Sequence, residues 1–368
     1  MGFKCGIVGL PNVGKSTLFN ALSNAKAQAA NYPFCTIDPN VGIVPVPDPR
    51  FDALVNQAAP QSVVPSTLEF VDIAGLVRGA SKGEGLGNQF LGHIRETDAV
   101  VHVVRCFRDE NVVHVDGSVN PLRDVETIEA ELLLADLATV EKRLDAARKK
   151  AKGGVAADKK AAEALEAIYA ELQKGNPARS VQLDDDGQEA MRQLHLLTAK
   201  PTLFVANVAE SEIHDALAGK HPLVNEVKKL AEPRGAKVVP ICAELEAQIQ
   251  ALAPEERKEF LAAAGLEEPG LNRLVREGYA LLSLITYFTV GPKEVRAWTI
   301  TKGTKAPGAA GKIHSDFERG FIKAEVIWWE DLLALKTEAA CRAAGKLAME
   351  GKEYVVRDGD VMHFKFNV

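Results

Sequence analysis

Residues 9–22, GLPNVGKSTLFNAL, decide the fold of this chain. Residues 9–16 match the pattern G-x-x-x-x-G-K-[ST], which here follows an apolar run at 3–10 and precedes a helical pattern. Glycines at this spacing let backbone N–H groups turn inward around the α- and β-phosphates of a nucleotide, at the N-terminus of a helix. The stretch therefore predicts the strand, loop and helix of a P-loop nucleotide-binding protein.

The residues of the loop and two later motifs predict a phosphate and Mg²⁺ site. Lys15 is expected to reach the β- and γ-phosphate oxygens, while the Ser16 hydroxyl binds Mg²⁺. In FVDIAG, Asp72 would hold the hydration shell of the metal, and the N–H of Gly75 would meet the γ-phosphate. In the turn-rich NYPFCTIDPNVG, Thr36 is placed to close over Mg²⁺ when triphosphate is bound. The predicted nucleotide-binding residues of the loop itself are Asn12, Val13, Gly14, Lys15, Ser16 and Thr17.

The residue that orients the attacking water is missing from its usual place. Leu76 follows Gly75 where Ras-like enzymes have a glutamine, and leucine cannot hydrogen-bond water. Either hydrolysis is slow, or a polar group comes from elsewhere in the chain. The candidate is His114 in DENVVHVDG, because a neutral imidazole can orient water. The alternative is a loop histidine that is merely solvated.

The motif NVAE, residues 207–210, bears on the choice of base. Guanine-specific enzymes of this class use N-K-x-D, in which the aspartate accepts from guanine N1 and N2 and the lysine packs on the base. This chain lacks the lysine and has the longer acid, whereas an asparagine amide can pair with adenine N6 and N7. Guanine recognition is weakened, but adenine is not proved. The predicted base-side residues are Asn207, Val208, Glu210, Cys242 and Ala243.

Composition and charge exclude several classes of protein. The 368 residues are 46% hydrophobic and 26% charged, and no apolar run reaches the roughly 18 to 20 residues of a membrane span. The five cysteines show no C-x-x-C spacing and are expected to be reduced, so we expect a cytoplasmic location without a membrane partner. A net charge of −6 argues against coating of nucleic acid, and no DNA partner is expected. A local basic stretch does occur at residues 142–160.

Six apolar runs separated by helical patterns predict a doubly wound α/β domain with a mostly parallel sheet, at residues 3–10, 41–46, 67–71, 99–106, 201–208 and 237–243. Residues of about 125–200 form a helical insertion, in which two antiparallel helices meet at Gly153-Gly154. The basic stretch then lies at the tip, either as a solvated face or as a probe for an acidic or RNA-rich partner. Residues 282–368 are predicted to form a small β-rich domain separate from residues 1–281, with a hairpin around Asp358-Gly359.

Together with the C-terminal stretch TVGPKEVRAWTITKGTKAPGAAGKIHSDFERGFIKAEV, these motifs resemble the YchF/Obg-like ATPase family over essentially the whole chain. The resemblance implies a TRAFAC-class P-loop NTPase domain, a helical hairpin and a C-terminal TGS domain of ubiquitin-like fold. It also implies ATP favoured over GTP, and association with ribosomes. The family pattern N-x-x-E matches Asn207 and Glu210, and Leu76 and the loop of His114 also fit. Asn12 resembles the asparagine that binds K⁺ in potassium-stimulated relatives, and Cys35 departs from a frequent threonine.

These observations predict an Mg²⁺-dependent ATP hydrolase that works as a slow switch on the ribosome, with K⁺ as an optional second cation. Two alternatives remain open at this point. One is a GTPase of translation or ribosome assembly. The other is an RNA- or ribosome-binding adaptor in which the nucleotide is a structural ligand that is hardly turned over.

Overall fold

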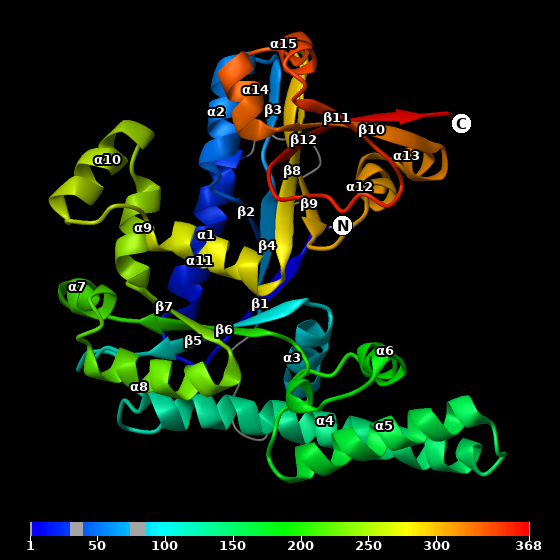
Figure 1. Ribbon diagram of the computed structural model, residues 1–368. Coiled ribbons are helices and arrows are strands. Elements are labelled where there is room, and N and C mark those ends of the chain that lie inside the picture. Colours follow the sequence, from blue (N-terminus) through cyan, green and yellow to red (C-terminus); the bar gives the residue numbers. More distant parts are fainter. Residues whose placement is uncertain (1, 30–39, 74–85, 368) are drawn as a thin grey trace. The chain divides into compact units, whose positions relative to one another are not determined.

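A computed structural model describes residues 2–29, 40–73 and 86–367 of the chain (Figure 1). Thr36, Gly75, Leu76 and Cys35 lie outside the described residues. The chain divides into two compact units, and each is described by itself. The first unit is built mainly from Met1–Ala27 and Glu69–Leu274, and the second mainly from Ile43–Leu68 and Val275–Val368. Within the described ranges, no helix is long and apolar enough to cross a membrane.

The first sheet has the strand order β2-β4-β1-β5-β6-β7. Its strands are β1 (Lys4–Val8), β2 (Val41–Pro45), β4 (Thr67–Asp72), β5 (Ala99–Arg105), β6 (Thr202–Asn207) and β7 (Lys237–Ile241). The pairings β1–β4, β1–β5, β5–β6 and β6–β7 are all parallel. Every residue of β5 is buried, as expected for a strand covered on both faces. The predicted doubly wound α/β fold is confirmed.

Helices lie between these strands along the chain or follow the last of them (Figure 1). They are α1 (Lys15–Ala29), α3 (Leu86–Arg95), α7 (Ile213–Leu217), α8 (Pro222–Ala231), α9 (Ala243–Ala251), α10 (Pro254–Ala263) and α11 (Gly270–Leu281). Helix α8 packs on β6 and β7, and its buried Val224 and Val227 join a core cluster with Phe204 of β6. Because α1 begins directly after the glycine-rich loop, its free N–H groups face the end of β1 where phosphate is expected.

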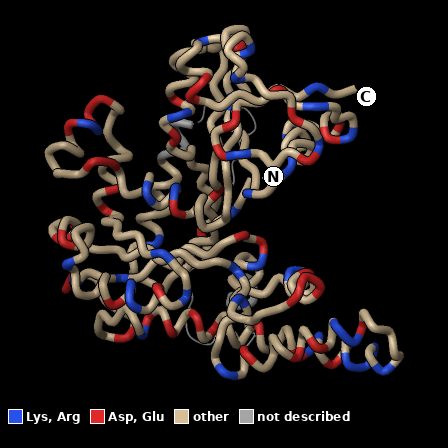
Figure 2. Tube along the Cα trace, in the orientation of Figure 1, with Lys and Arg blue, Asp and Glu red and all other residues tan. Residues whose placement is uncertain are grey.

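The predicted helical insertion is present. Helices α4 (Pro121–Ala151) and α5 (Ala156–Gln173) pack against each other, and α6 (Asp185–Gln193) packs against α5. Val140 and Leu144 of α4 meet Leu165 and Ile168 of α5 in a buried cluster. The turn between the helices contains Gly154 at φ +84°, a left-handed conformation that favours glycine. Lys and Arg gather at this end of the hairpin (Figure 2).

The second unit contains another sheet, with strand order β11-β10-β12-β8-β9-β3. Its elements are β3 (Ser62–Val64), β8 (Leu284–Val290), β9 (Glu294–Thr301), β10 (Phe321–Trp328), β11 (Leu347–Glu350), β12 (Asp360–Phe366), α2 (Pro49–Ala58), α12 (Ala306–Ile313), α13 (Ser315–Arg319), α14 (Trp329–Leu335) and α15 (Glu338–Ala343). Sequence patterns did not predict that α2 and β3 belong here. Phe51 and Leu54 of α2 bury their side chains against Phe288 and Leu332.

The hairpin predicted around Asp358-Gly359 is wrong. Strand β12 pairs antiparallel with β10 and parallel with β8, and the residues before it form no strand with it. The turn is instead tied to other elements of the second unit. Asp358 Oδ1 accepts a 2.9 Å hydrogen bond from the N–H of Thr286, and its carboxylate pairs with Arg50 at 3.1 Å. A turn signal cannot show which strand the following residues will pair with.

Candidate nucleotide-binding site

The glycine-rich loop has the shape that close contact with phosphate requires. Asn12 and Gly14 have φ values of +63° and +88°, so the loop turns in the left-handed region at two positions. A Cβ on Gly14 would lie 2.1 Å from Nδ2 of Asn207, and one on Gly9 would lie 2.8 Å from the carbonyl oxygen of Val103. Larger residues are therefore excluded at both glycines, and the loop is held close to the ends of the neighbouring strands.

Lys15 and Asp72, predicted separately from two motifs, come together in the structure. The Lys15 side chain is 9% exposed and its Nζ forms an ion pair with Oδ1 of Asp72. Ser16 is exposed on the first turn of α1. A hydroxyl and a carboxylate are oxygen donors of the kind that Mg²⁺ prefers, so these residues fit the cation that P-loop proteins generally use. A bound phosphate can attract the Lys15 ammonium away from the Asp72 carboxylate.

Asn207 joins two loops through its side-chain amide. Its Nδ2 donates to the carbonyl oxygen of Val13 at 2.9 Å, and its Oδ1 accepts from the N–H of Ala243 at 3.0 Å. The residue is 5% exposed. The sequence suggested that this amide pairs with adenine, but in the structure both of its polar atoms link the phosphate loop to the start of α9. The choice between adenine and guanine therefore depends on the groups that surround Asn207.

A cavity of about 260 Å³ lies beside this bridge, at the ends of β5, β6 and β7. The predicted residues Asn12, Gly14, Thr17, Asn207, Val208, Glu210, Cys242 and Ala243 all line it. The sequence reasoning did not find the other wall, which is formed by Phe107, Arg108, Asp109 and Val112 in the loop after β5. The cavity is suited to the base of a nucleotide whose phosphates lie at the glycine-rich loop.

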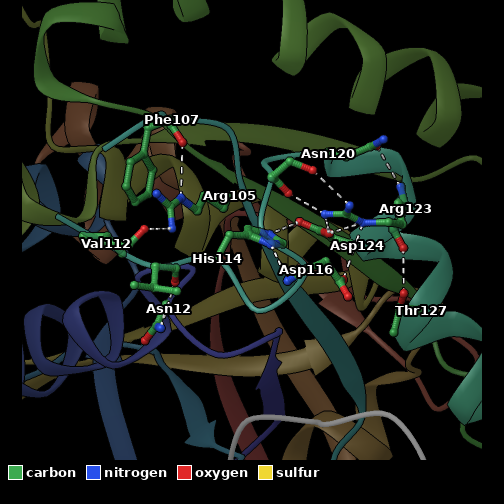
Figure 3. A network of polar contacts seen from close by, with 12 residues as sticks. Asn12, Arg105, Phe107, Val112, His114, Asp116, Asn120, Arg123, Asp124 and Thr127 are labelled. Carbon is green, nitrogen blue, oxygen red and sulfur yellow. Dashed lines mark hydrogen bonds and ion pairs between the residues drawn. The ribbon is translucent and has the colours of Figure 1, made fainter. Parts of the chain in front are cut away.

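Arg105 holds that second wall in place (Figure 3). It ends β5 and is only 1% exposed. Its guanidinium donates to the carbonyl oxygens of Phe107 at 3.2 Å and Val112 at 2.9 Å, and lies 4.5 Å from the centre of the Phe107 ring. A buried arginine needs partners for its charge and its donors, and backbone carbonyls supply them here. The signal in the sequence was an arginine at the end of a strand whose other residues, apart from His102, are apolar.

His114 is buried and both of its ring nitrogens are engaged (Figure 3). Nδ1 accepts from the N–H of Asp116 at 3.1 Å, so the proton lies on Nε2, which donates to Oδ2 of Asp124 at 2.8 Å. The alternative of a merely solvated histidine is wrong. The neighbouring carbonyl oxygen of Val113 accepts from Nδ2 of Asn12 at 3.0 Å, which ties this loop to the phosphate loop. In this conformation the imidazole has no nitrogen free to orient water.

The fold and the glycine-rich loop define a P-loop nucleotide-binding protein. Residues 4–135 match a family described as 50S ribosome-binding GTPase, and residues 284–367 match one described as a protein of unknown function and labelled as the C-terminal part of YchF GTPases. The chain belongs to the YchF family, as the sequence motifs predicted.

Relatives resemble the chain over its whole length. It is 55% identical to the ribosome-binding ATPase YchF of Pasteurella multocida and 54% identical to that of Bacillus subtilis, with 100% of each chain covered in both comparisons. The solved structure of the Schizosaccharomyces pombe YchF GTPase is 43% identical, with a TM-score of 0.89 over 99% of this chain and 98% of that one. The second unit is consistent with the TGS-like β-rich domain that the resemblance implied.

Proposed function

We propose that the protein binds ATP with Mg²⁺, hydrolyses it slowly, and acts as a switch on the ribosome in the cytoplasm. The observation that carries the nucleotide part is the built phosphate loop, in which Gly14 closes on Asn207 and Lys15 pairs with Asp72. The relatives of Pasteurella multocida and Bacillus subtilis, both named ribosome-binding ATPases, are 55% and 54% identical over the full length, which supports extending both activities to this chain.

In the proposed reaction the chain positions phosphate and neutralises its charge. The γ-phosphate attracts the Lys15 ammonium away from Asp72, and the N–H groups at the start of α1 hold the β-phosphate. Mg²⁺, when bound, supplies further neutralising charge, and Ser16 and Asp72 would hold it. We assign Thr36 to the metal and Gly75 to the γ-phosphate from the sequence motifs alone. A K⁺ ion, if used, would meet the amide oxygen of Asn12, whose nitrogen already donates to Val113.

We assign the activation of water to His114 as part of this proposal. Because its Nε2–H bonds to Asp124, the ring must leave that carboxylate before it contacts water. Its loop is tied to Asn12 of the phosphate loop, so a change at the phosphate loop on nucleotide binding reaches the loop of His114 directly. We therefore expect turnover to be slow as long as nucleotide binding does not rearrange this loop.

ATP should bind more tightly than GTP. Val208 lies where guanine-specific proteins have lysine, and it is 2% exposed within an apolar core cluster. Guanine would therefore lose the packing of the lysine on its ring, a loss of about tenfold or more in affinity. Calorimetry on nucleotide-free protein, with Mg²⁺ and K⁺ present, measures both affinities side by side. Equal or tighter binding of GTP would make the GTPase alternative the better one.

The basic tip of the helical hairpin supports contact with ribosomal RNA. Lys149, Lys150 and Lys152 are exposed there, and no carboxylate among the described residues pairs with them. Reversal of all three charges should weaken ribosome binding by at least about tenfold and reduce its dependence on salt, because fewer phosphate contacts release fewer counterions. Co-sedimentation with ribosomes at several salt concentrations measures this.

The matched control reverses Lys220, which precedes α8, together with Lys228 and Lys229 of α8, so it makes the same change of charge in another part of the first unit. If both triple variants bind ribosomes equally well, the tip is a solvated face. If only the tip variant loses binding while ATP turnover without ribosomes stays normal, the hairpin is the contact element.

A further inference from the structure

A second cavity of about 460 Å³ lies in the first unit and shares no lining residue with the nucleotide cavity. It is bounded by α4, by the segment 175–180 after α5, and by Pro233 and Arg234 beyond α8. Apolar side chains of α4, among them Leu132 and Leu133, form one wall. Its volume and mixed lining are those of a small-molecule site.

Arg179 provides an unpaired cation in this cavity. Its backbone N–H and its Nη1 both donate to the carbonyl oxygen of Thr198, at 3.3 and 3.1 Å. Thr198 is itself fixed, because its N–H and hydroxyl donate to the buried Asp136 at 2.7 and 2.6 Å. In the part of the chain that the structure describes, no carboxylate forms an ion pair with Arg179, and its other guanidinium donors have no hydrogen-bond partner. Glu129, which pairs with Arg234, attracts the charge of Arg179 without contacting it.

The charged groups of the cavity other than Arg179 cancel each other. Arg234 forms an ion pair with Glu129, which leaves one positive charge on Arg179. His102 also lines the cavity, but burial lowers its pKa to about 3, so it is neutral at pH 7. Burial also lowers the pKa of Arg179, although a guanidinium stays charged at neutral pH. One net positive charge beside an apolar wall is complementary to a single negative charge on an apolar body.

We propose that this cavity binds a small organic monoanion, a carboxylate or sulfonate whose acid group meets the free donors of Arg179 while its apolar body packs on Leu132 and Leu133. A guanidinium presents paired N–H donors that match such a group. The ligand would touch α4, which carries the basic tip at its far end, and β5, which ends at Arg105 beside the nucleotide cavity. The inference does not depend on which nucleotide the protein binds.

The probe for the test is 8-anilinonaphthalene-1-sulfonate, a fluorescent monoanion with an apolar body, titrated into the full chain with saturating Mg²⁺ and ADP. Arg179→Met keeps the length of the side chain and removes the charge, and should weaken binding by about tenfold or more. The control is Arg192→Met on α6, an exposed arginine paired with Glu189 outside the cavity. It should bind the probe as the wild type does.

Two further arms separate charge recognition from simple apolar binding. Ser180→Trp adds bulk at an exposed position of the lining and keeps the Arg179 contact with Thr198, so it tests the cavity even if Arg179→Met fails to fold. It should also weaken the probe. Octanoate should displace the probe and octyltrimethylammonium should not. Unchanged affinity in the two cavity variants, or equal displacement by the cation, overturns the proposal. These comparisons remain valid without ADP if nucleotide binding itself proves wrong.

Discussion

Lys15→Ala should lower ATP turnover by about 10²- to 10³-fold or more, and should weaken ATP binding as well. Lys15 is the one cation of the described phosphate loop, and its side chain is 91% shielded from solvent beside Asp72. Alanine removes the charge that meets the γ-phosphate, so one of the positive groups that neutralise the phosphate charge is lost. Calorimetry and a phosphate-release assay measure the two losses.

The control for this variant is Lys229→Ala, which removes an exposed lysine of α8 in the same unit. Thermal unfolding of both variants separates loss of the site from loss of the fold. A Lys15→Ala protein that is folded and turns ATP over at the wild-type rate would refute the assignment of the phosphate loop. Retained ribosome binding in a variant without turnover would show that the two activities are separable.

The phosphate site could be predicted because its chemistry is local in sequence. Residues 9–17 specify a tight loop, a helix start and a lysine within one short segment, and the resulting φ values at Asn12 and Gly14 follow from that local pattern. Asp72 was found because it ends an apolar strand, and parallel strands bring their carboxyl ends to one edge of the sheet. Thr36 and Gly75 remain predictions from the motifs.

The same reasoning could not predict the loop that forms a wall of the base cavity. It also could not predict which residues belong to the second unit. Arg105 acts through backbone carbonyls of a loop whose path has no sequence pattern. Residues 43–68 join the second unit because α2 buries Phe51 and Leu54 against residues more than 200 positions later, and amphipathic periodicity does not identify the partner. Asn207 was identified, but its bridging role depends on two loops that only the fold brings together.

Asn207→Ala should reduce ATP affinity by more than about tenfold and lower the free energy of unfolding by about 2 to 4 kcal/mol. The Val13 carbonyl and the Ala243 N–H would lose their partner, and each unpaired buried group costs about 1 to 3 kcal/mol. The matched control is Asn225→Ala, which removes an amide that donates to Gly219 at 2.8 Å nearer the surface. Urea unfolding and ATP titration should show little change there.

Asn207→Asp tests whether Asn207 acts through its hydrogen bonds or only by filling space, because it keeps the shape of the side chain. Its carboxylate can still accept from Ala243, but it places a second acceptor 2.9 Å from the carbonyl oxygen of Val13. Burial and this repulsion favour the protonated acid, which can donate to Val13 as the amide did. The folded state therefore binds the proton more tightly than the unfolded state, and stability relative to wild type should rise as the pH falls. A stability difference from wild type that does not change with pH would show that the bond from Asn207 to Val13 does not hold the phosphate loop in place.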